Sequence, residues 1–169
     1  LNGYRQSGSR VNPDEADDVM QKIKDMAQRQ GLSYDGTFAN PDIYTKSNKF
    51  GAKIDWNIND FNKFSFRWSY VDAKQLNVVS SASSLNDDHY YFPFTSKTNS
   101  FTAELQSRLS PVVSNEARVS YVRVRDKRNV SSAFPMISLQ VTGGSVNIGN
   151  ERSSMANSLD QDIYTIEDN

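Results

Sequence analysis

The feature that most constrains the fold is an alternation of apolar and polar residues in residues 50–70. The apolar residues occupy every second position on either side of a short break, and they are Phe50, Ala52, Ile54, Trp56, Ile58, Phe64, Phe66, Trp68 and Tyr70. Apart from Gly51, the residues that alternate with them on either side of the break are polar or charged. This period of two predicts two half-buried antiparallel strands joined by the short turn NDFNK. The apolar face meets either a protein core or lipid.

A second hairpin is predicted in residues 101–125, with the turn SPVVSNE between its strands. One face of this hairpin carries Phe101, Ala103, Leu105, Leu109, Ala117, Val119 and Tyr121, with Ser107 among them. Beyond Tyr121 the pattern shifts by one residue, because Val122 and Val124 now alternate with Arg123 and Arg125. Such a shift indicates either a β-bulge or the end of the apolar zone.

One helix is predicted, in residues 13–30. Asn12 is a good N-cap, Pro13 suits the first helical position, and Gly31 suits a helix end in the left-handed conformation. An apolar stripe at helical spacing consists of Val19, Ile23, Met26 and Ala27. This stripe predicts a surface helix packed on its own protein, and a partner-binding helix is the alternative.

The composition narrows the function classes. Of the 169 residues, 37% are hydrophobic and 23% charged, as in an ordinary folded domain, and the net charge of −1 argues against a nucleic-acid partner. With no cysteine and a single histidine, the chain has no thiolate or multi-histidine metal site, and no apolar run is long enough for a membrane-spanning helix. We find no nucleophile beside a base, no phosphate-binding glycine loop and no paired carboxylates. We therefore predict no enzyme, no cofactor and no metal.

The chain divides into three predicted parts. Residues 1–48 hold the helix in a segment that resembles an extracellular loop. Residues 49–128 form a β-meander of two hairpins, in residues 50–70 and 101–125, joined by a long loop in residues 71–100. Residues 129–169 form a long loop with short strands in SAFPMISLQV and SVNIG, and VTGGSV is a turn. Long structureless loops are unusual in a compact soluble domain.

Three features favour lipid over a core. Aromatic residues crowd around the first turn, short and long connections alternate, and the strands are about 9 to 11 residues long, as membrane-barrel strands are. The predicted lipid-facing residues are Phe50, Ile54, Trp56, Ile58, Phe64, Phe66, Trp68, Tyr70, Phe101, Leu105, Leu109, Val119 and Tyr121. The predicted fold is therefore all-β, a mainly antiparallel up-and-down meander from a transmembrane β-barrel, with one surface α-helix near the N-terminus. Because four strands cannot close a barrel, other strands must complete it.

Three stretches carry a family resemblance: NKFGAKIDWNINDFNKFSFRWSYVDAKQ, TNSFTAELQSRLSPVVSNEARVSYVRVRDKR and NIGNERSSMANSLDQDIYTIEDN. They resemble the barrel region of TonB-dependent outer-membrane receptors, more narrowly the Oar-like branch, whose members carry a carboxypeptidase-regulatory-like domain. The resemblance implies a barrel of about 22 strands around a plug, in the cell outer membrane. It also implies import of a nutrient with energy passed on by TonB.

The resemblance further implies the partners. They are the remaining barrel strands and plug, outer-membrane lipid, an unknown nutrient ligand, and TonB through an N-terminal region of the parent receptor. We see no TonB box, plug or closing strand in the sequence, and we therefore expect this chain to be a segment of the receptor barrel. On this basis it takes part in ligand capture and import by the whole protein.

The predicted ligand-binding residues lie in the sequence DDHYYFPF, and they are His89, Tyr90, Tyr91, Phe92 and Phe94. Aromatic side chains on an outer loop give a large contact area at low entropic cost, which suits a peptide, sugar or chelate. The alternative is that these rings pack the loop against its own barrel. Asp87 and Asp88 beside His89 lack further ligands at useful spacing, although calcium could recruit loop carbonyls.

Two other possibilities stay open. A basic patch of Arg123, Arg125 and residues 126–128 could contact anionic headgroups, or it is a solvated cluster of charges. The chain as a whole could instead be a soluble antiparallel β surface domain, acting as an adhesin or glycan-binding module. Its polar mean hydropathy of −0.66 is compatible with that alternative.

Overall fold

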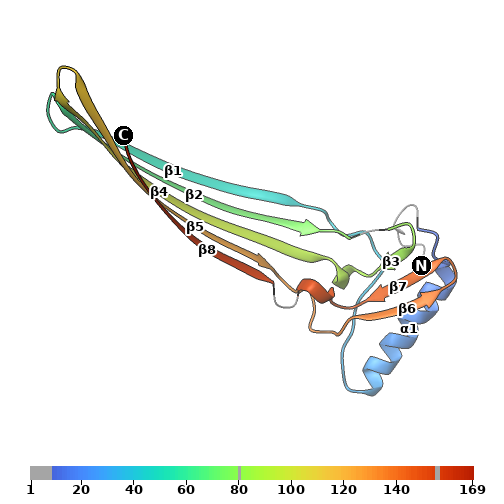
Figure 1. Ribbon diagram of the computed structural model, residues 1–169. Helices are drawn as coiled ribbons and strands as arrows, with labels where there is room; N and C mark the ends of the chain where they lie inside the picture. The colour runs from blue at the N-terminus through green and yellow to red at the C-terminus, as the bar shows by residue number, and fades with distance from the viewer. Residues whose placement is uncertain (1–8, 80, 155–156) are drawn as a thin grey trace. The chain divides into compact units, whose positions relative to one another are not determined.

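The computed structural model describes residues 9–79, 81–154 and 157–169. The chain forms two compact units (Figure 1). We call them the helical unit, made of Leu1–Tyr44, Gln75–Phe94 and Arg128–Asn157, and the sheet unit, made of Thr45–Lys74, Thr95–Lys127 and Ser158–Asn169. The predicted fold class is confirmed, since the chain is mostly antiparallel β-sheet with one N-terminal α-helix.

The sheet unit is a five-stranded sheet in the order β1-β2-β4-β5-β8 (Figure 1). Its strands are β1 (Thr45–Asn57), β2 (Asn62–Asn77), β4 (Phe92–Ser110), β5 (Val113–Arg128) and β8 (Ser158–Asp168), and the ends of β2, β4 and β5 belong to the helical unit. Strands β5 and β8 pair antiparallel without interruption from Ala117 opposite Asp168 to Lys127 opposite Ser158. No bulge against β8 therefore explains the shift after Tyr121. The change lies in the residue types along a regular strand, as expected where an apolar zone ends.

The strands are longer than the sequence pattern predicted. The predicted loop in residues 71–100 is wrong at both ends, because β2 continues to Asn77 and β4 begins at Phe92. The prediction of only short strands in residues 129–169 is also wrong, because β8 is an 11-residue strand of the large sheet. Hydrogen bonding continues where the apolar alternation has stopped, as the bond of 2.7 Å from the Asn129 N–H to the Pro93 carbonyl shows.

The helical unit packs α1 (Pro13–Arg29) with a small sheet in the order β3-β7-β6. Strand β7 (Gly144–Ile148) pairs in parallel with β3 (Ser84–Asn86) and antiparallel with β6 (Ile137–Val141). Two single-turn 3₁₀ helices, η1 (Asp88–Tyr90) and η2 (Arg152–Ser154), follow β3 and β7. The buried core of this unit comprises Val11, Ala16, Met20, Ile23, Ala27, Tyr34, Leu85, Val146 and Ile148.

Helix α1 forms as its sequence predicts. The Asn12 side chain accepts hydrogen bonds from the Asp14 and Glu15 N–H groups, and Gly31 takes a φ of 73° after the last turn. The prediction that the helix packs on its own protein is confirmed, since Ala16 and Met20 join the apolar stripe in the core. Met26 was wrongly placed in that stripe and is 52% exposed. Among the residues described, no helix is long and apolar enough to cross a membrane.

The turn predicted in VTGGSV is confirmed between β6 and β7. Gly143 has a φ of 89°, a conformation that favours glycine. A Cβ atom at this position would lie 1.9 Å from the Arg10 carbonyl oxygen. Glycine is therefore needed here both for the turn and for the close approach of the segment before α1.

Candidate functional site

A row of aromatic side chains crosses the sheet unit on one face. Ring centroids lie 6.5 Å apart between Phe66 and Phe101, 6.2 Å between Phe101 and Tyr121, and 4.8 Å between Tyr121 and Tyr164. These residues come from β2, β4, β5 and β8, which are consecutive neighbours in the sheet. Side chains alternate between the two faces of a strand. On each strand, every second residue counted from one of these aromatic residues therefore lies on the same face. We call it the aromatic face.

On each of the five strands of the sheet unit, the residues of the aromatic face change from apolar to polar next to the aromatic row. In β1, Phe50 stacks on Tyr70 of β2 with centroids 6.4 Å apart. The last apolar residues before polar ones are Phe50, Tyr70, Phe101, Tyr121 and Tyr164. The residues two positions further along the same face are Asn48, Asp72, Asn99, Arg123 and Asp162. All five apolar runs thus end in an aromatic ring, as they do at a membrane–water interface.

This aromatic row was not predicted. The sequence drew attention to aromatic residues around the β1–β2 turn, whereas the row lies at the opposite end of the apolar runs. Tyr164 was missed because β8 was taken for loop. The sequence does contain a signal for this row. In each strand an aromatic residue at the end of the apolar run is followed, two positions further along the same face, by a polar residue.

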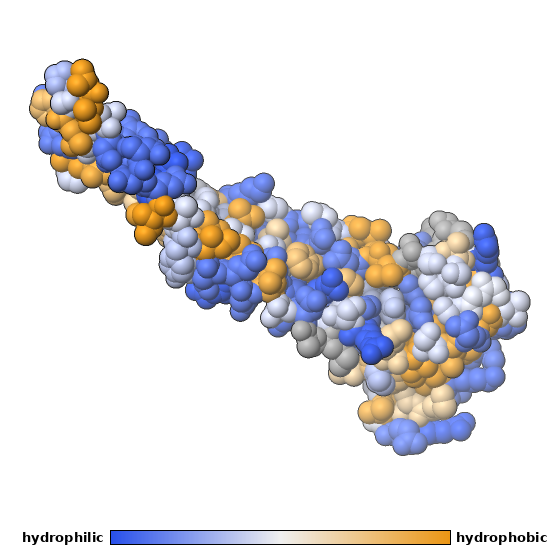
Figure 2. Space-filling model, viewed as in Figure 1, coloured by the Kyte–Doolittle hydropathy of each residue, from blue (hydrophilic) through white to orange (hydrophobic). Residues whose placement is uncertain are grey.

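The residues predicted to face lipid lie on the aromatic face, and many are well exposed. Phe50 and Ile54 are each 61% exposed, Trp56 is 59% and Leu109 is 69% exposed. The residues Phe64, Phe66, Trp68, Tyr70, Phe101 and Tyr121 are half-buried against neighbouring side chains. Figure 2 shows hydrophobic groups at the surface along the strands. A sheet with so much exposed apolar side chain needs another apolar partner.

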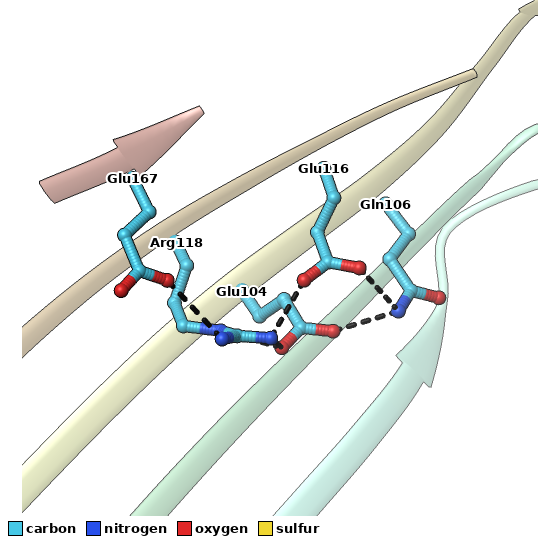
Figure 3. Close-up of polar contacts among 5 residues, drawn as sticks. All are labelled: Glu104, Gln106, Glu116, Arg118 and Glu167. Carbon is cyan, nitrogen blue, oxygen red and sulfur yellow. Dashed lines mark hydrogen bonds and ion pairs between the residues drawn. The ribbon is translucent and has the colours of Figure 1, made fainter. Parts of the chain in front are cut away.

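The opposite face of the sheet unit carries a network of charges around Arg118 of β5 (Figure 3). The Arg118 guanidinium lies 2.6 Å from Glu116, 3.0 Å from Glu104 of β4 and 3.2 Å from Glu167 of β8. Gln106 donates a hydrogen bond of 2.7 Å to Glu104. One cation thus joins three strands, and two negative charges remain in excess. We call this side the polar face.

A groove of about 800 Å³ lies at the turn end of the sheet unit. Its lining includes Asn57, Asn62, Arg108, Asn115 and Glu116. The guanidinium of Arg108 lies 5.6 Å from the centroid of the Phe61 ring, and the Arg108 backbone N–H donates a hydrogen bond of 2.8 Å to the Phe61 carbonyl. These contacts hold the β1–β2 turn against β4. The groove is therefore explained by the packing of this turn on the sheet.

In the helical unit, Asp87 and Asp88 form hydrogen bonds that hold the loop before β4. The buried Asp87 carboxylate accepts from the Tyr90 N–H at 2.9 Å and from the Gly149 N–H at 3.2 Å. Burial raises the pKa of Asp87 to about 7. The Asp88 carboxylate accepts from the backbone N–H and the hydroxyl of Thr37, at 2.8 and 3.1 Å.

These bonds bear on metal binding. Carboxylate and imidazole atoms of Asp87, Asp88 and His89 lie within 4.8 Å of one another. The same carboxylate oxygens already accept hydrogen bonds from Tyr90, Gly149 and Thr37, and the His89 Nε2 lies 3.3 Å from the Asp35 carboxylate. The arrangement is that of a loop tied together by its own polar groups.

The predicted ligand-binding residues divide into two groups. Tyr91 is fully buried and Phe92 is only 8% exposed, with the Arg128 guanidinium 5.1 Å from the centroid of the Phe92 ring. Burial raises the pKa of the Tyr91 hydroxyl to about 12. These two rings pack inside the helical unit, which corrects their assignment to ligand contact. His89, Tyr90 and Phe94 are half-buried and keep part of their surface open.

Comparison with protein families gives the decisive finding. The family model described as "Outer membrane beta barrel domain" matches residues 2–162. The chain belongs to the outer membrane β-barrel domain family. Neither a curated protein nor a solved structure matches it. Membership places the protein in the outer membrane and decides against the soluble surface module.

For an outer membrane β-barrel domain, the open sheet edges at β1 and β8 have a physical consequence. Unpaired backbone N–H and C=O groups are not tolerated in hydrocarbon, so a barrel has no free edges. The smallest membrane barrels have about 8 strands, and the sheet here has five. A sheet of five strands is therefore too small to close such a barrel by itself.

Proposed function

We propose that this chain is part of the barrel wall of a TonB-dependent receptor and takes part in ligand capture and import by the whole protein. The observation that carries the proposal is the separation of the sheet unit into an aromatic face and a polar face. The TonB-dependent assignment is supported by the resemblance of its three long stretches to the barrels of that receptor class.

In this proposal the aromatic face contacts lipid and the polar face lines the lumen. Burying an exposed side chain such as Ile54 or Trp56 in lipid removes apolar surface from water, which stabilises the inserted state. The Arg118 network would be costly against hydrocarbon, whereas water or a polar plug in the lumen can solvate it. The partners are the other barrel strands, the plug and outer-membrane lipid.

The long connections give the orientation. Outer-membrane barrels have short turns on the periplasmic side and long loops outside. The β1–β2 and β4–β5 turns are short, whereas residues 78–91 and 129–157 connect β2 to β4 and β5 to β8. We therefore place the helical unit outside the cell. There His89, Tyr90 and Phe94 are the residues available to a nutrient ligand, which the whole receptor imports with energy from TonB.

Cysteine labelling tests the two faces, because the chain contains no cysteine of its own. Single Ile54→Cys and Lys53→Cys variants of the complete protein, in bilayers, would carry a nitroxide label. Collision with oxygen should dominate at position 54, and collision with a water-soluble nickel chelate should dominate at position 53. Equal access to the nickel chelate at both positions would contradict the assignment of the aromatic face to lipid.

Growth tests the import role. Cells carrying the protein, cells lacking it and cells with a Tyr90→Ala variant would be compared on limiting peptide, glycan or iron-chelate sources. We expect the deletion to abolish growth on one source and Tyr90→Ala to weaken it, with the same loss when TonB is inactivated. Uptake that persists without TonB would refute TonB dependence while leaving the barrel assignment intact.

A further inference from the structure

Beyond the aromatic row, the aromatic face of the sheet unit is rich in cations. The cationic residues on this face are Lys46, Lys74, Lys97, Arg123, Arg125 and Lys127. The carboxylates on the same stretch of the face are Asp72, Asp160 and Asp162. Six cations therefore stand against three carboxylates, in a chain whose net charge is −1. The excess of positive charge is local to one end of one face.

Two of the three carboxylates on this stretch of the face form ion pairs with Arg125. The Arg125 guanidinium lies 2.7 Å from Asp162 and 3.7 Å from Asp160, and the Tyr121 hydroxyl donates to Asp162 at 2.6 Å. Within the part of the chain that the structure describes, no ion pair joins a carboxylate to Lys74, Lys97, Arg123 or Lys127. These four side chains are exposed. Their charge is available to a partner.

We infer that this cationic zone binds the phosphate groups of anionic lipid headgroups. The inference rests on the proposed function, because it takes the aromatic face as the lipid-facing side. Aromatic rings mark the membrane interface, so charges two to six residues beyond them lie at headgroup depth. Each lysine or arginine near an anionic surface contributes about 1 kcal/mol, and arginine can bind a phosphate through two N–H groups.

Headgroups fit this zone better than a soluble phosphate compound does. A small ligand is normally held in a concave site that encloses most of its surface. The cations here are spread over four neighbouring strands, β1, β2, β4 and β5, on an exposed face of the sheet. A lipid leaflet presents phosphates over an equally extended area, directly beside the hydrocarbon that meets the aromatic row. The geometry thus favours a lipid surface.

The test compares two lipid probes on the complete barrel protein in a zwitterionic detergent. The probes are fluorescent phosphatidic acid and fluorescent phosphatidylcholine with identical acyl chains. A Lys97→Gln/Arg123→Gln variant removes two cations from the zone, and a Lys63→Gln/Arg67→Gln variant removes two from the polar face. We expect the preference for phosphatidic acid to fall by about tenfold or more in the first variant and to stay unchanged in the second.

Three results would overturn the inference. Equal loss in both variants would show an effect of net charge alone. Displacement of the phosphatidic acid probe by equimolar inorganic phosphate would show a phosphate site that does not need a lipid. No preference for phosphatidic acid in the unmodified protein would show that the cations serve something other than lipid, such as an acidic protein. If oxygen access at position 54 has already shown a lipid-facing surface, each result refutes this inference and leaves the proposed function standing.

Discussion

Glu167 of β8 lies directly opposite Arg118 of β5, and the Arg118 Nη1 lies 3.2 Å from the Glu167 Oε2. Since Glu104 and Glu116 also contact this guanidinium, Arg118→Met would leave three carboxylates together without their cation. We expect a lower urea midpoint of unfolding for the complete barrel, by less than a core truncation such as Ile148→Ala causes. Arg67→Met, which removes a charge from the same face outside this network, should change the midpoint little. Equal effects would show that the network does not stabilise the sheet.

Charge on the aromatic face should be costly near the middle of the apolar run. Ile54 lies midway between Phe50 and Ile58 on β1, so Ile54→Lys should destabilise the inserted barrel by about 2–4 kcal/mol. Asn57→Lys introduces the same charge on the polar face of the same strand and should cost far less. Unfolding in urea from lipid vesicles measures both. A similar loss for the two variants would mean that β1 does not present one face to hydrocarbon.

Burial of Asp87 makes the stability of the helical unit depend on pH. Its pKa is about 7 in the folded state and 3.8 in the unfolded reference, so the folded state binds more protons between these values. Stability should therefore fall as pH rises from about 4 to 7, and change little from this source above 7. Amide hydrogen exchange at Gly149 and Tyr90 reports on the loop that Asp87 holds.

The matched variants are Asp87→Asn and Asp42→Asn. Asparagine keeps one acceptor for the Tyr90 N–H but cannot titrate, so Asp87→Asn should flatten the pH dependence of the stability that amide exchange measures. Asp42 is exposed, and its replacement should leave the pH dependence as it is. A profile that stays steep in Asp87→Asn would assign the effect to another group.

The β6–β7 turn should not tolerate a side chain at Gly143. Alanine there must adopt a φ of 89° and place its Cβ where the Arg10 carbonyl lies, so Gly143→Ala should unfold the helical unit more readily. Gly31→Ala isolates the two causes, because Gly31 also has a positive φ but nothing within 4 Å of a Cβ atom. We expect about 1–2 kcal/mol for Gly31→Ala and more for Gly143→Ala, by thermal unfolding. Equal losses would show that the close approach to Arg10 is relieved at no cost.

Sequence alone predicted the elements whose chemistry is local. Asn12, Pro13 and Gly31 mark the limits of α1, because capping and left-handed turns depend on a few neighbouring residues. The two hairpins were predicted because one face of each strand is apolar over nearly its whole length. The same reasoning identified the lipid-facing candidates on β1, β2, β4 and β5.

Strand β8 was missed for a physical reason. On its aromatic face, Asp160 and Asp162 precede Tyr164 and Ile166, while Ile163 lies on the other face, so no apolar alternation runs through it. Only its long-range pairing with β5 defines it as a strand. The burial of Tyr91 and Phe92 likewise depends on contacts within the helical unit that bring distant segments together. An aromatic sequence cannot by itself distinguish a ring that packs from a ring that binds.

The core of the helical unit is assembled from three separated stretches of chain. Met20 precedes both hairpins, Leu85 lies between them, and Val146 follows both. Loop closure over such separations is unfavourable until the intervening strands have paired. We expect the core of the helical unit to form last during biogenesis. This core then becomes compact only in molecules whose strands have paired in the correct register. Surface proteases would remove molecules whose strands had paired wrongly.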